Sequence, residues 1–363
     1  MLRRGLILHT GLFVVACLLG LRAWTAEDEP NKKTVAAELW SGRVGELSRI
    51  EYRTDKKVVV LEPKEDEAGR YFIGRVETLA EKPKPAATGA DAGAPAAAKP
   101  NDPHGADPHG HGAHSPPTPE SSEPKRFISL TKGNELAESL ATLKASRVLG
   151  KISPERIADF GFDKTDQGEL KVVVAGKEHS LQLGEKTPGG SDRYVRDTGT
   201  GEAYVIAGTI ANDLTSADNR LIEREFHDFG EDKVAKVVVK TATGSREVVR
   251  HAVEKDFWAR PESPDTKDET VSNWMTKVDR LRVTTYVEPL DPEPKPEDQV
   301  VVVEYFNDRG RKLGYLELVR RPAKDAKEKP DYVARSERTR WHATVLKSTA
   351  EQIEQDLASV LAP

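Results

Sequence analysis

The chain contains two stretches that read alike: YVRDTGTGEAYVI at residues 194–206 and YVARSERTRWHATV at residues 332–345. In each, a short run rich in β-branched and aromatic residues leads through a polar turn into a second such run, which is typical of a β-hairpin. A segment with helical periodicity follows both hairpins. A repeated strand–turn–strand–helix unit indicates an internal duplication, so the flanking sequence should repeat as well.

The helix expected before each hairpin carries the same apolar stripe in both copies. We expect the first over residues 132–145 and the second from Lys267 onward. In each, three apolar side chains recur at the i, i+4, i+7 spacing that places them on one helix face. They are Leu136, Leu140 and Leu143 in the first helix, and Val271, Met275 and Val278 in the second.

A long insertion interrupts the first copy. From Lys82 to Pro124 the chain consists mostly of Ala, Pro, Gly, His, Asp and Ser, without aromatic or branched aliphatic residues. Such a composition cannot bury enough apolar surface to offset its ordering entropy, so we predict that residues 82–124 are disordered. The sequence separation between corresponding residues of the two copies is larger for residues before this segment than for residues after it. The difference is about the length of the segment, which places the segment in a loop of the first copy.

These patterns predict an α+β protein made of two duplicated units. Each unit would be a mostly antiparallel sheet with a helix packed on one face, because hairpins alternate with single amphipathic helices. The expected organisation is a signal anchor or transmembrane helix (1–26), a stem (27–34), a first unit (35–218) that contains the insertion, and a second unit (219–363). Two aromatic pairs, Tyr71-Phe72 and Phe257-Trp258, end strands at corresponding places, and we interpret both as core.

The charge balance argues against nucleic acid as a partner. There are 55 Lys and Arg residues against 60 Asp and Glu residues, and no strongly basic block follows the N-terminus. The single cysteine, Cys17, falls inside the N-terminal apolar run. The rest of the chain therefore offers no disulfide, no thiol nucleophile and no cysteine-based zinc site.

The N-terminal segment has the pattern of a membrane anchor. Arg3 and Arg4 precede a mainly apolar run from Gly5 to Trp24, close to the ~20 residues that cross a bilayer as a helix. The two arginines, set against the acidic residues 27–29, place the N-terminus in the cytoplasm by the positive-inside rule. We therefore expect a single-pass protein of the bacterial inner membrane, held through residues 5–24, with its C-terminal bulk in the periplasm.

Two other fates of this segment stay open. Cleavage as a signal peptide after Ala26 fits less well, because bulky Trp24 stands where a small residue is preferred. Lipidation is the third alternative, since Val-Val-Ala-Cys at residues 14–17 loosely resembles a lipobox. Against lipidation, Leu18 and Leu19 continue the apolar run past Cys17.

On these features the chain resembles domain-of-unknown-function family 4340, whose members are membrane-anchored bacterial envelope proteins. The resemblance covers most of residues 35–361. It rests on the anchor, the aromatic-ended strand pairs with their following helix, the Phe160-Gly161-Phe162 turn, the Tyr194 hairpin and the bridge from Asn219-Arg220-Leu221-Ile222 to Phe226. The proline that usually follows the Phe-Gly turn in the family is missing. The resemblance implies an envelope protein or an ABC-transporter component of the gliding-motility type as partner, and it implies no reaction.

The insertion holds the sharpest cluster of metal-ligating side chains. Imidazole is the commonest nitrogen ligand for Zn, Cu and Ni, and His-rich tracts bind such metals. The residues are His104, His109, His111 and His114. Their spacing matches no fixed coordination geometry, so a solvated spacer is the competing interpretation.

The sequence contains no G-x-S-x-G, H-E-x-x-H or P-loop motif. The glycine-rich stretches 189–191 and 198–201 join β segments, whereas a phosphate cradle normally opens a helix. We therefore expect a non-enzymatic, membrane-anchored envelope protein without a cofactor, which acts as a scaffold or interaction module accessory to an ABC-transporter or gliding-type system. The alternative is an envelope protein that binds Zn or Cu through the histidines of the insertion.

Overall fold

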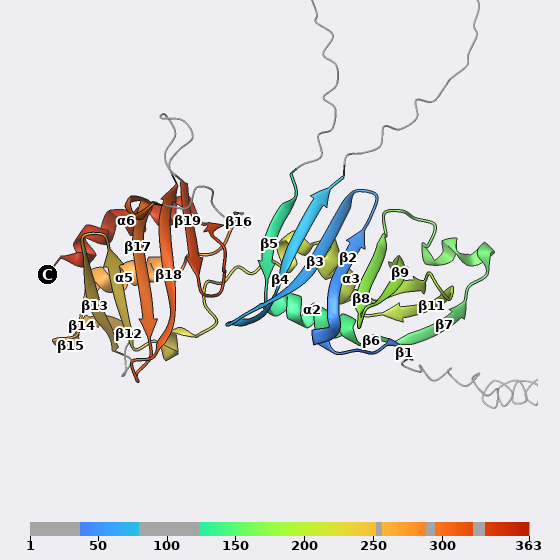
Figure 1. Cartoon of the computed structure of the whole chain (residues 1–363), viewed down its shortest axis with the longest axis horizontal. Coiled ribbons are helices and arrows are strands. Elements are labelled where there is room, and N and C mark those ends of the chain that lie inside the picture. The colour runs from blue at the N-terminus through green and yellow to red at the C-terminus, as the bar shows by residue number, and fades with distance from the viewer. Residues whose placement is uncertain (1–36, 80–122, 252–255, 288–294, 322–330, 363) are drawn as a thin grey trace, which may run out of the picture.

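The computed structural model describes residues 37–79, 123–251, 256–287, 295–321 and 331–362 (Figure 1). Within these ranges the chain forms two nine-stranded sheets with a few helices. Every pair of neighbouring strands in both sheets is antiparallel. The predicted α+β class with mostly antiparallel sheets is therefore confirmed for the described residues.

The first sheet draws its strands from residues 47–206. Alternate side chains of its central strands are buried, as in Glu169–Val174, because successive residues of a strand face opposite sides of the sheet. From one edge to the other the strands are β5 (Lys125–Ser129), β4 (Gly69–Thr78), β3 (Lys57–Asp66), β2 (Leu47–Arg53), β8 (Glu169–Val174), β9 (Lys177–Lys186), β10 (Arg193–Asp197), β11 (Glu202–Ile206) and β7 (Arg147–Lys151).

The second sheet draws its strands from residues 236–344. In the same direction they are β15 (Ser263–Lys267), β14 (Phe257–Arg260), β13 (Gly244–His251), β12 (Lys236–Thr241), β17 (Gln299–Phe306), β18 (Lys312–Arg321), β19 (Asp331–Ser336), β20 (Ala343–Thr344) and β16 (Thr285–Tyr286). If strands are ranked along the chain within each sheet, both sheets have the order 4-3-2-1-6-7-8-9-5. The two sheets thus share one topology.

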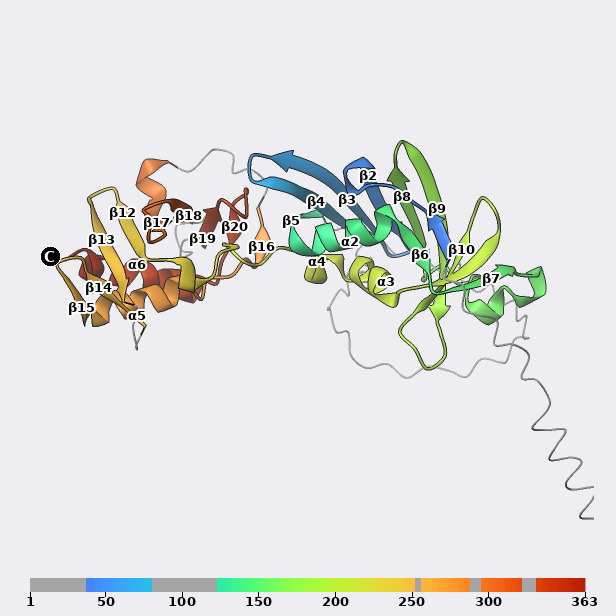
Figure 2. The same cartoon turned by 90° about the horizontal axis from the view of Figure 1, so that it is seen from below.

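Helices cover the same side of both sheets (Figure 2). In the first unit these are α2 (Thr131–Ala141), α3 (Gly208–Thr215) and α4 (Ala217–Arg220), and in the second they are α5 (Glu269–Val278) and α6 (Lys347–Leu361). The predicted stripe is buried in α2 at Leu136 and Leu140, and in α5 at Val271 and Met275. The indole N–H of the buried Trp274 donates to the Ile353 carbonyl at 2.9 Å and so fixes α5 against α6.

The helix predicted over residues 132–145 ends earlier than expected. α2 stops at Ala141, and Leu143–Ala145 form a short strand, β6, which pairs with β1 (Ala37–Trp40). The cause is non-local: the indole of Trp40 donates to the Leu140 carbonyl at 2.7 Å and caps the last turn. Leu143 is buried as predicted, but as a strand residue.

After β7 the chain forms two 3-10 turns, η2 (Pro154–Arg156) and η3 (Ala158–Phe160). Pro154 occupies the first helical position, where its missing N–H costs nothing. Gly161 ends the second turn with φ of 72°, a left-handed conformation that favours glycine. The segment Phe160-Gly161-Phe162 thus ends the pair of 3-10 turns.

The two sheets meet edge to edge, with β5 of the first beside β16 of the second (Figures 1 and 2). The bridge between the units runs along this junction. The Glu223 backbone N–H donates to the Ile128 carbonyl of β5 at 2.8 Å, and Val283 donates to the Arg224 carbonyl at 3.1 Å. The bridge therefore joins the edge of the first sheet to the segment just before β16.

Several predictions concern residues outside the described ranges. They are the anchor at residues 5–24 with Cys17, and nearly all of the 82–124 insertion with its four histidines. Among the helices that the structure does describe, none is long and apolar enough to cross a membrane.

Candidate functional site

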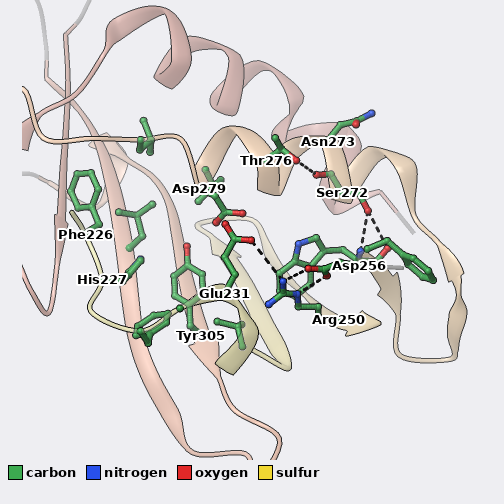
Figure 3. A pocket seen from close by; sticks show the side chains of 18 of the residues that line it. Phe226, His227, Glu231, Arg250, Asp256, Ser272, Asn273, Thr276, Asp279 and Tyr305 are labelled. Carbon is green, nitrogen blue, oxygen red and sulfur yellow. Dashed lines mark hydrogen bonds and ion pairs between the residues drawn. The ribbon is translucent and has the colours of Figure 1, made fainter. Parts of the chain in front are cut away.

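The second unit contains a cavity of about 500 Å³ beside the C-terminal end of α5 (Figure 3). Its walls come from α5, from β13, β14 and β17, and from the chain that enters β12 through η4 (Glu231–Lys233). The polar side chains that define its chemistry are His227, Glu231, Arg250, Asp256, Asp279 and Tyr305. A concave pocket with a few converging polar groups is the usual form of a small-ligand site.

Asp279 is placed in the pocket by the end of α5. Its backbone N–H closes the last turn on the Met275 carbonyl at 2.8 Å. A carboxylate at this end faces the negative pole of the helix dipole. Burial first, and the charge of Glu231 next, raise the pKa of Asp279 to about 7, although Arg250 and Arg282 oppose the shift. This carboxyl makes no hydrogen bond or ion pair with any other described residue.

Arg250, on β13, contacts neighbouring carboxylates through two of its three guanidinium nitrogens, while its buried Nη1 has no hydrogen-bond partner among the described residues. Its Nε donates to Asp256 Oδ1 at 2.7 Å, its Nη2 contacts the other Asp256 oxygen, and Glu231 lies 3.7 Å from the same Nη2. The hydrogen bond that Arg250 donates to Asp256 is the main reason that the pKa of Arg250 is raised. Arg250 therefore acts as a permanent structural cation on this wall.

Three rings form the opposite wall. His227 stacks on Phe229 with 4.6 Å between ring centroids and meets Tyr305 edge-on at the same distance. Its Nδ1 lies 2.9 Å from Glu337 Oε1, which fixes the orientation of the imidazole. Tyr305 is only 4 % exposed, and its phenol points toward Asp279 without a hydrogen bond to any described residue (Figure 3). Burial raises the pKa of this phenol well above its usual value.

Two hydroxyl groups on the rim are engaged by the backbone. Ser272 Oγ accepts from the Trp258 N–H at 3.1 Å and donates to the Trp258 carbonyl at 3.3 Å, while Thr276 Oγ1 donates to the Ser272 carbonyl at 2.9 Å. A nucleophilic hydroxyl needs a side-chain base within hydrogen-bond reach. Within the described ranges both hydroxyls bond backbone groups, and neither has such a base.

The corresponding place in the first unit is filled. With Leu47 aligned to Val234, Trp40 stands where the second unit has His227. Trp40 is 7 % exposed, stacks on His179 at 4.4 Å and packs against the end of α2. The smaller imidazole of the second unit contacts Glu337 and lines the pocket.

A second cluster of charged and aromatic residues lies at the junction of the units. The turn after β19 sends Arg340 to the tip of the β3–β4 hairpin, where it binds Asp66 through Nε–Oδ2 (2.7 Å) and Nη2–Oδ1 (2.9 Å). The same guanidinium lies over the Tyr71 ring at 4.6 Å. Its neighbour Trp341 is covered by Arg126 of β5 at 5.2 Å.

Arg338 ties the same turn to the bridge. Its Nη2 donates to Glu223 Oε2 at 2.8 Å and to Thr131 Oγ1, at the start of α2, at 2.9 Å. Glu223 is 8 % exposed, and its carbonyl also accepts from the Tyr286 hydroxyl of β16 at 3.0 Å. We call the contacts of Arg338 and Arg340 with Glu223, Thr131 and Asp66 the inter-unit joint.

A family model described as a domain of unknown function (DUF4340) matches residues 132–300. The chain therefore carries a DUF4340 domain. The DUF4340 match begins in α2 of the first unit and ends in β17 of the second, so it includes the bridge and the pocket residues Glu231, Arg250 and Asp279. Searches of curated proteins and of solved structures returned no match.

The structure gives new places to several residues that the sequence singled out. Of the aromatic pairs, Phe72 is buried as predicted, and Tyr71 and Trp258 pack against the core while remaining partly exposed. Tyr71 also lies at the joint, and Phe257 and Trp258 line the pocket. The proposed metal ligands His104, His109, His111 and His114 lie outside the described residues. The described residues hold no group of three or more His, Cys, Asp or Glu arranged to bind a metal.

Sequence reasoning missed the pocket and the joint. Asp279, Glu231 and Arg250 come from three separate elements, and their spacing in the sequence resembles no motif. One usable signal was an acidic residue at the C-terminal end of a helix, where a cation is preferred. A second was the pair of arginines, Arg338 and Arg340, in a turn whose counterpart (198–201) has none.

Proposed function

We propose that this chain is a non-catalytic, membrane-anchored envelope protein whose two units form one platform for a partner protein. The partner would be an envelope protein or an ABC-transporter component of the gliding-motility type. The location would be the bacterial inner membrane, with residues 5–24 as the anchor and the two units in the periplasm.

The inter-unit joint is the observation that carries this proposal. Two sheets linked only by a bridge would move independently, and neither could present a surface of fixed shape with the other. Arg340 makes a bidentate contact with Asp66, and Arg338 bonds the bridge at Glu223. Bidentate pairs add geometric specificity as well as energy. The joint thus supports a function that needs both sheets in one orientation.

The shared topology supports an internal duplication in which the second unit gained a new role. Both sheets have the same strand order. In the first unit, the turn that corresponds to the joint is closed on itself, because Asp197 Oδ1 accepts from the backbone N–H groups of Gly199 and Thr200 at 2.8 Å each. In the second unit, Arg338 and Arg340 of the equivalent turn contact residues of the first unit. We infer that the duplicated hairpin was adapted to fix the two units together.

Crosslinking in intact membranes tests the proposal. The full chain with an affinity tag is compared with a control that keeps the N-terminal segment but lacks residues 35–361. We expect the full chain to recover one or a few envelope proteins that the control does not recover. Recovery of the same proteins with both would mean that the folded units recruit no partner, and the proposal would fail.

A further inference from the structure

The pocket of the second unit presents an uncompensated negative charge. Its cations are already paired with carboxylates: Arg250 with Asp256, Arg282 Nε with Glu225 Oε1 at 3.2 Å, and Lys267 Nζ with Glu269 Oε2 at 2.8 Å. The Asp279 carboxyl makes no such pair with a described residue. The Glu231 carboxylate points toward Asp279 (Figure 3). The ion pair that Glu231 forms with Arg250 is long, at 3.7 Å.

A second and independent feature points into the same space. The phenol of Tyr305, almost fully buried, faces Asp279 with its hydroxyl unbonded to other described residues (Figure 3). Because Tyr305 lines the cavity and its hydroxyl has no hydrogen-bond partner among the described residues, this hydroxyl marks a position where a ligand atom can bind. A ligand N–H group between these side chains could donate to the carboxylate and to the phenolic oxygen.

The third feature is the apolar wall beside these polar groups. The rings of His227, Phe229 and Tyr305 pack at 4.6–5.5 Å from one another. Aromatic faces attract cations and cover the apolar body of a ligand. A cavity of about 500 Å³ has room for a small molecule or for one long side chain.

We propose that this pocket binds an organic cation, an ammonium or guanidinium group on a short apolar body, with Asp279 as its counter-ion and Tyr305 as a second hydrogen-bond partner. The site goes beyond the platform function and does not depend on it. The cation is either a free amine or the lysine or arginine side chain of a bound protein, and these share the chemistry that the pocket recognises.

Protonation of Asp279 gives the proposal a distinctive signature. Because its pKa is raised to about 7, this carboxyl holds its proton in a fraction of the molecules near neutral pH, and an incoming cation would displace that proton. The charged groups around it are Glu231 and Asp256, which favour protonation, and Arg250 and Arg282, which oppose it. Binding should therefore release protons near pH 7, and affinity should rise as pH rises through the pKa of Asp279.

Isothermal titration of the purified full chain tests the site. The probes are 2-phenylethylammonium, 1,5-diaminopentane, agmatine and N-acetyl-lysine methylamide, and the uncharged and anionic controls are 2-phenylethanol and benzenesulfonate. We expect the cations to bind and the controls not to bind, with an enthalpy that changes with the ionisation enthalpy of the buffer. A free amine that binds more tightly than the lysine mimic identifies a small-molecule ligand, and the reverse order identifies a partner's side chain.

Two variants locate the binding. Asp279→Asn should weaken the ammonium probes at least about tenfold and abolish the proton release, and Tyr305→Phe should weaken them several-fold. Glu262→Gln, which removes an equal charge from an exposed turn outside the pocket, should change neither. The proposal is overturned if no cation binds at millimolar concentration, if 2-phenylethanol binds as tightly as its ammonium analogue, or if Asp279→Asn binds like the unmodified chain.

Discussion

Arg340 and Asp66, which are 274 residues apart in the sequence, form a bidentate contact of 2.7 and 2.9 Å. This contact fixes the second sheet to the tip of a hairpin of the first. The Arg340 side chain is only 10 % exposed, and Tyr71 covers it from one side. Its backbone adopts φ of 58°, a left-handed conformation that is unusual for arginine. This strained backbone conformation directs the Arg340 guanidinium across the junction to Asp66.

A double-mutant cycle measures what this contact contributes. Asparagine tolerates the left-handed conformation, so Arg340→Asn removes the guanidinium without adding backbone strain. Because Asp66 is about a third exposed, we expect Arg340→Asn to lower the free energy of unfolding by only about 1–2 kcal/mol. Asp66→Asn on top of it should cost little more, since both changes break the same contact. Additive losses in urea unfolding would show that the two residues act separately.

The same contact predicts a dependence on pH. The hydrogen bonds from Arg340 lower the pKa of Asp66 below its usual value. A carboxyl whose folded pKa is depressed stabilises the fold above its unfolded pKa of about 4 and loses this effect as pH falls through the folded value. The stability difference between the unmodified chain and Asp66→Asn should therefore shrink below about pH 4. A difference that stays constant to pH 3 would contradict this account.

The raised pKa of Asp279 predicts the opposite dependence of stability on pH. Its folded pKa of about 7 lies above the unfolded value, so the folded state binds this proton more tightly. Stability should therefore fall as pH rises from about 4 to about 7 and then level off. Asp279→Asn should raise the free energy of unfolding by about 1–3 kcal/mol at pH 8 and by much less at pH 4. Thermal unfolding beside the matched Glu262→Gln variant measures this, and an equal effect at both pH values would argue against a buried titrating carboxyl.

Trp40 should be far more important for stability than the residue that corresponds to it. Trp40→Ala leaves a large void under α2 and an unpaired Leu140 carbonyl, so we expect a loss of about 3–5 kcal/mol. His227→Ala widens an existing pocket and should cost about 1 kcal/mol. Chemical denaturation of both variants compares the filled site with the open one. Similar losses would mean that the pocket is part of the packed core.

The insertion should be dispensable for the fold. β4 and β5 already pair through Val76 and Lys125 on either side of it. Replacing residues 80–122 by a six-residue Gly/Ser loop should stabilise the chain by about 1–2 kcal/mol, because a shorter loop loses less entropy on closure. The same variant tests the metal-binding alternative. Zinc binding by the full chain that disappears with the insertion would support that alternative, and its absence from the full chain would remove it.

The repeated patterns predicted the elements because they are local. The hairpins at Tyr194 and Tyr332 and the buried stripes of α2 and α5 depend on period and turn chemistry, which a short window of sequence contains. Leu143 shows the limit: it continues the helical spacing but lies in β6. Trp40, about a hundred residues earlier, ends the helix, and no local pattern reveals such a contact.

The pocket and the joint could not be predicted for the same reason. Tyr305 lies in a strand, where the sequence pattern predicts a core residue. Its place in the pocket is evident only once the structure brings Asp279 close to it. Arg340 reads as an ordinary residue of a polar turn until its partner Asp66 is seen. Each site depends on residues that the topology brings together from distant parts of the chain.

The most direct test of the proposed platform function exchanges the charges of Arg340 and Asp66 at the joint. The readout is crosslinking to partner proteins in membranes. The compared chains are the unmodified protein, Arg340→Asp, Asp66→Arg and the double variant, each at matched expression. We predict that each single variant recovers less envelope partner than the unmodified protein, and that the double variant regains a large part of the loss. Equal recovery from all four chains would contradict the claim that the two units must be held in one orientation to bind a partner.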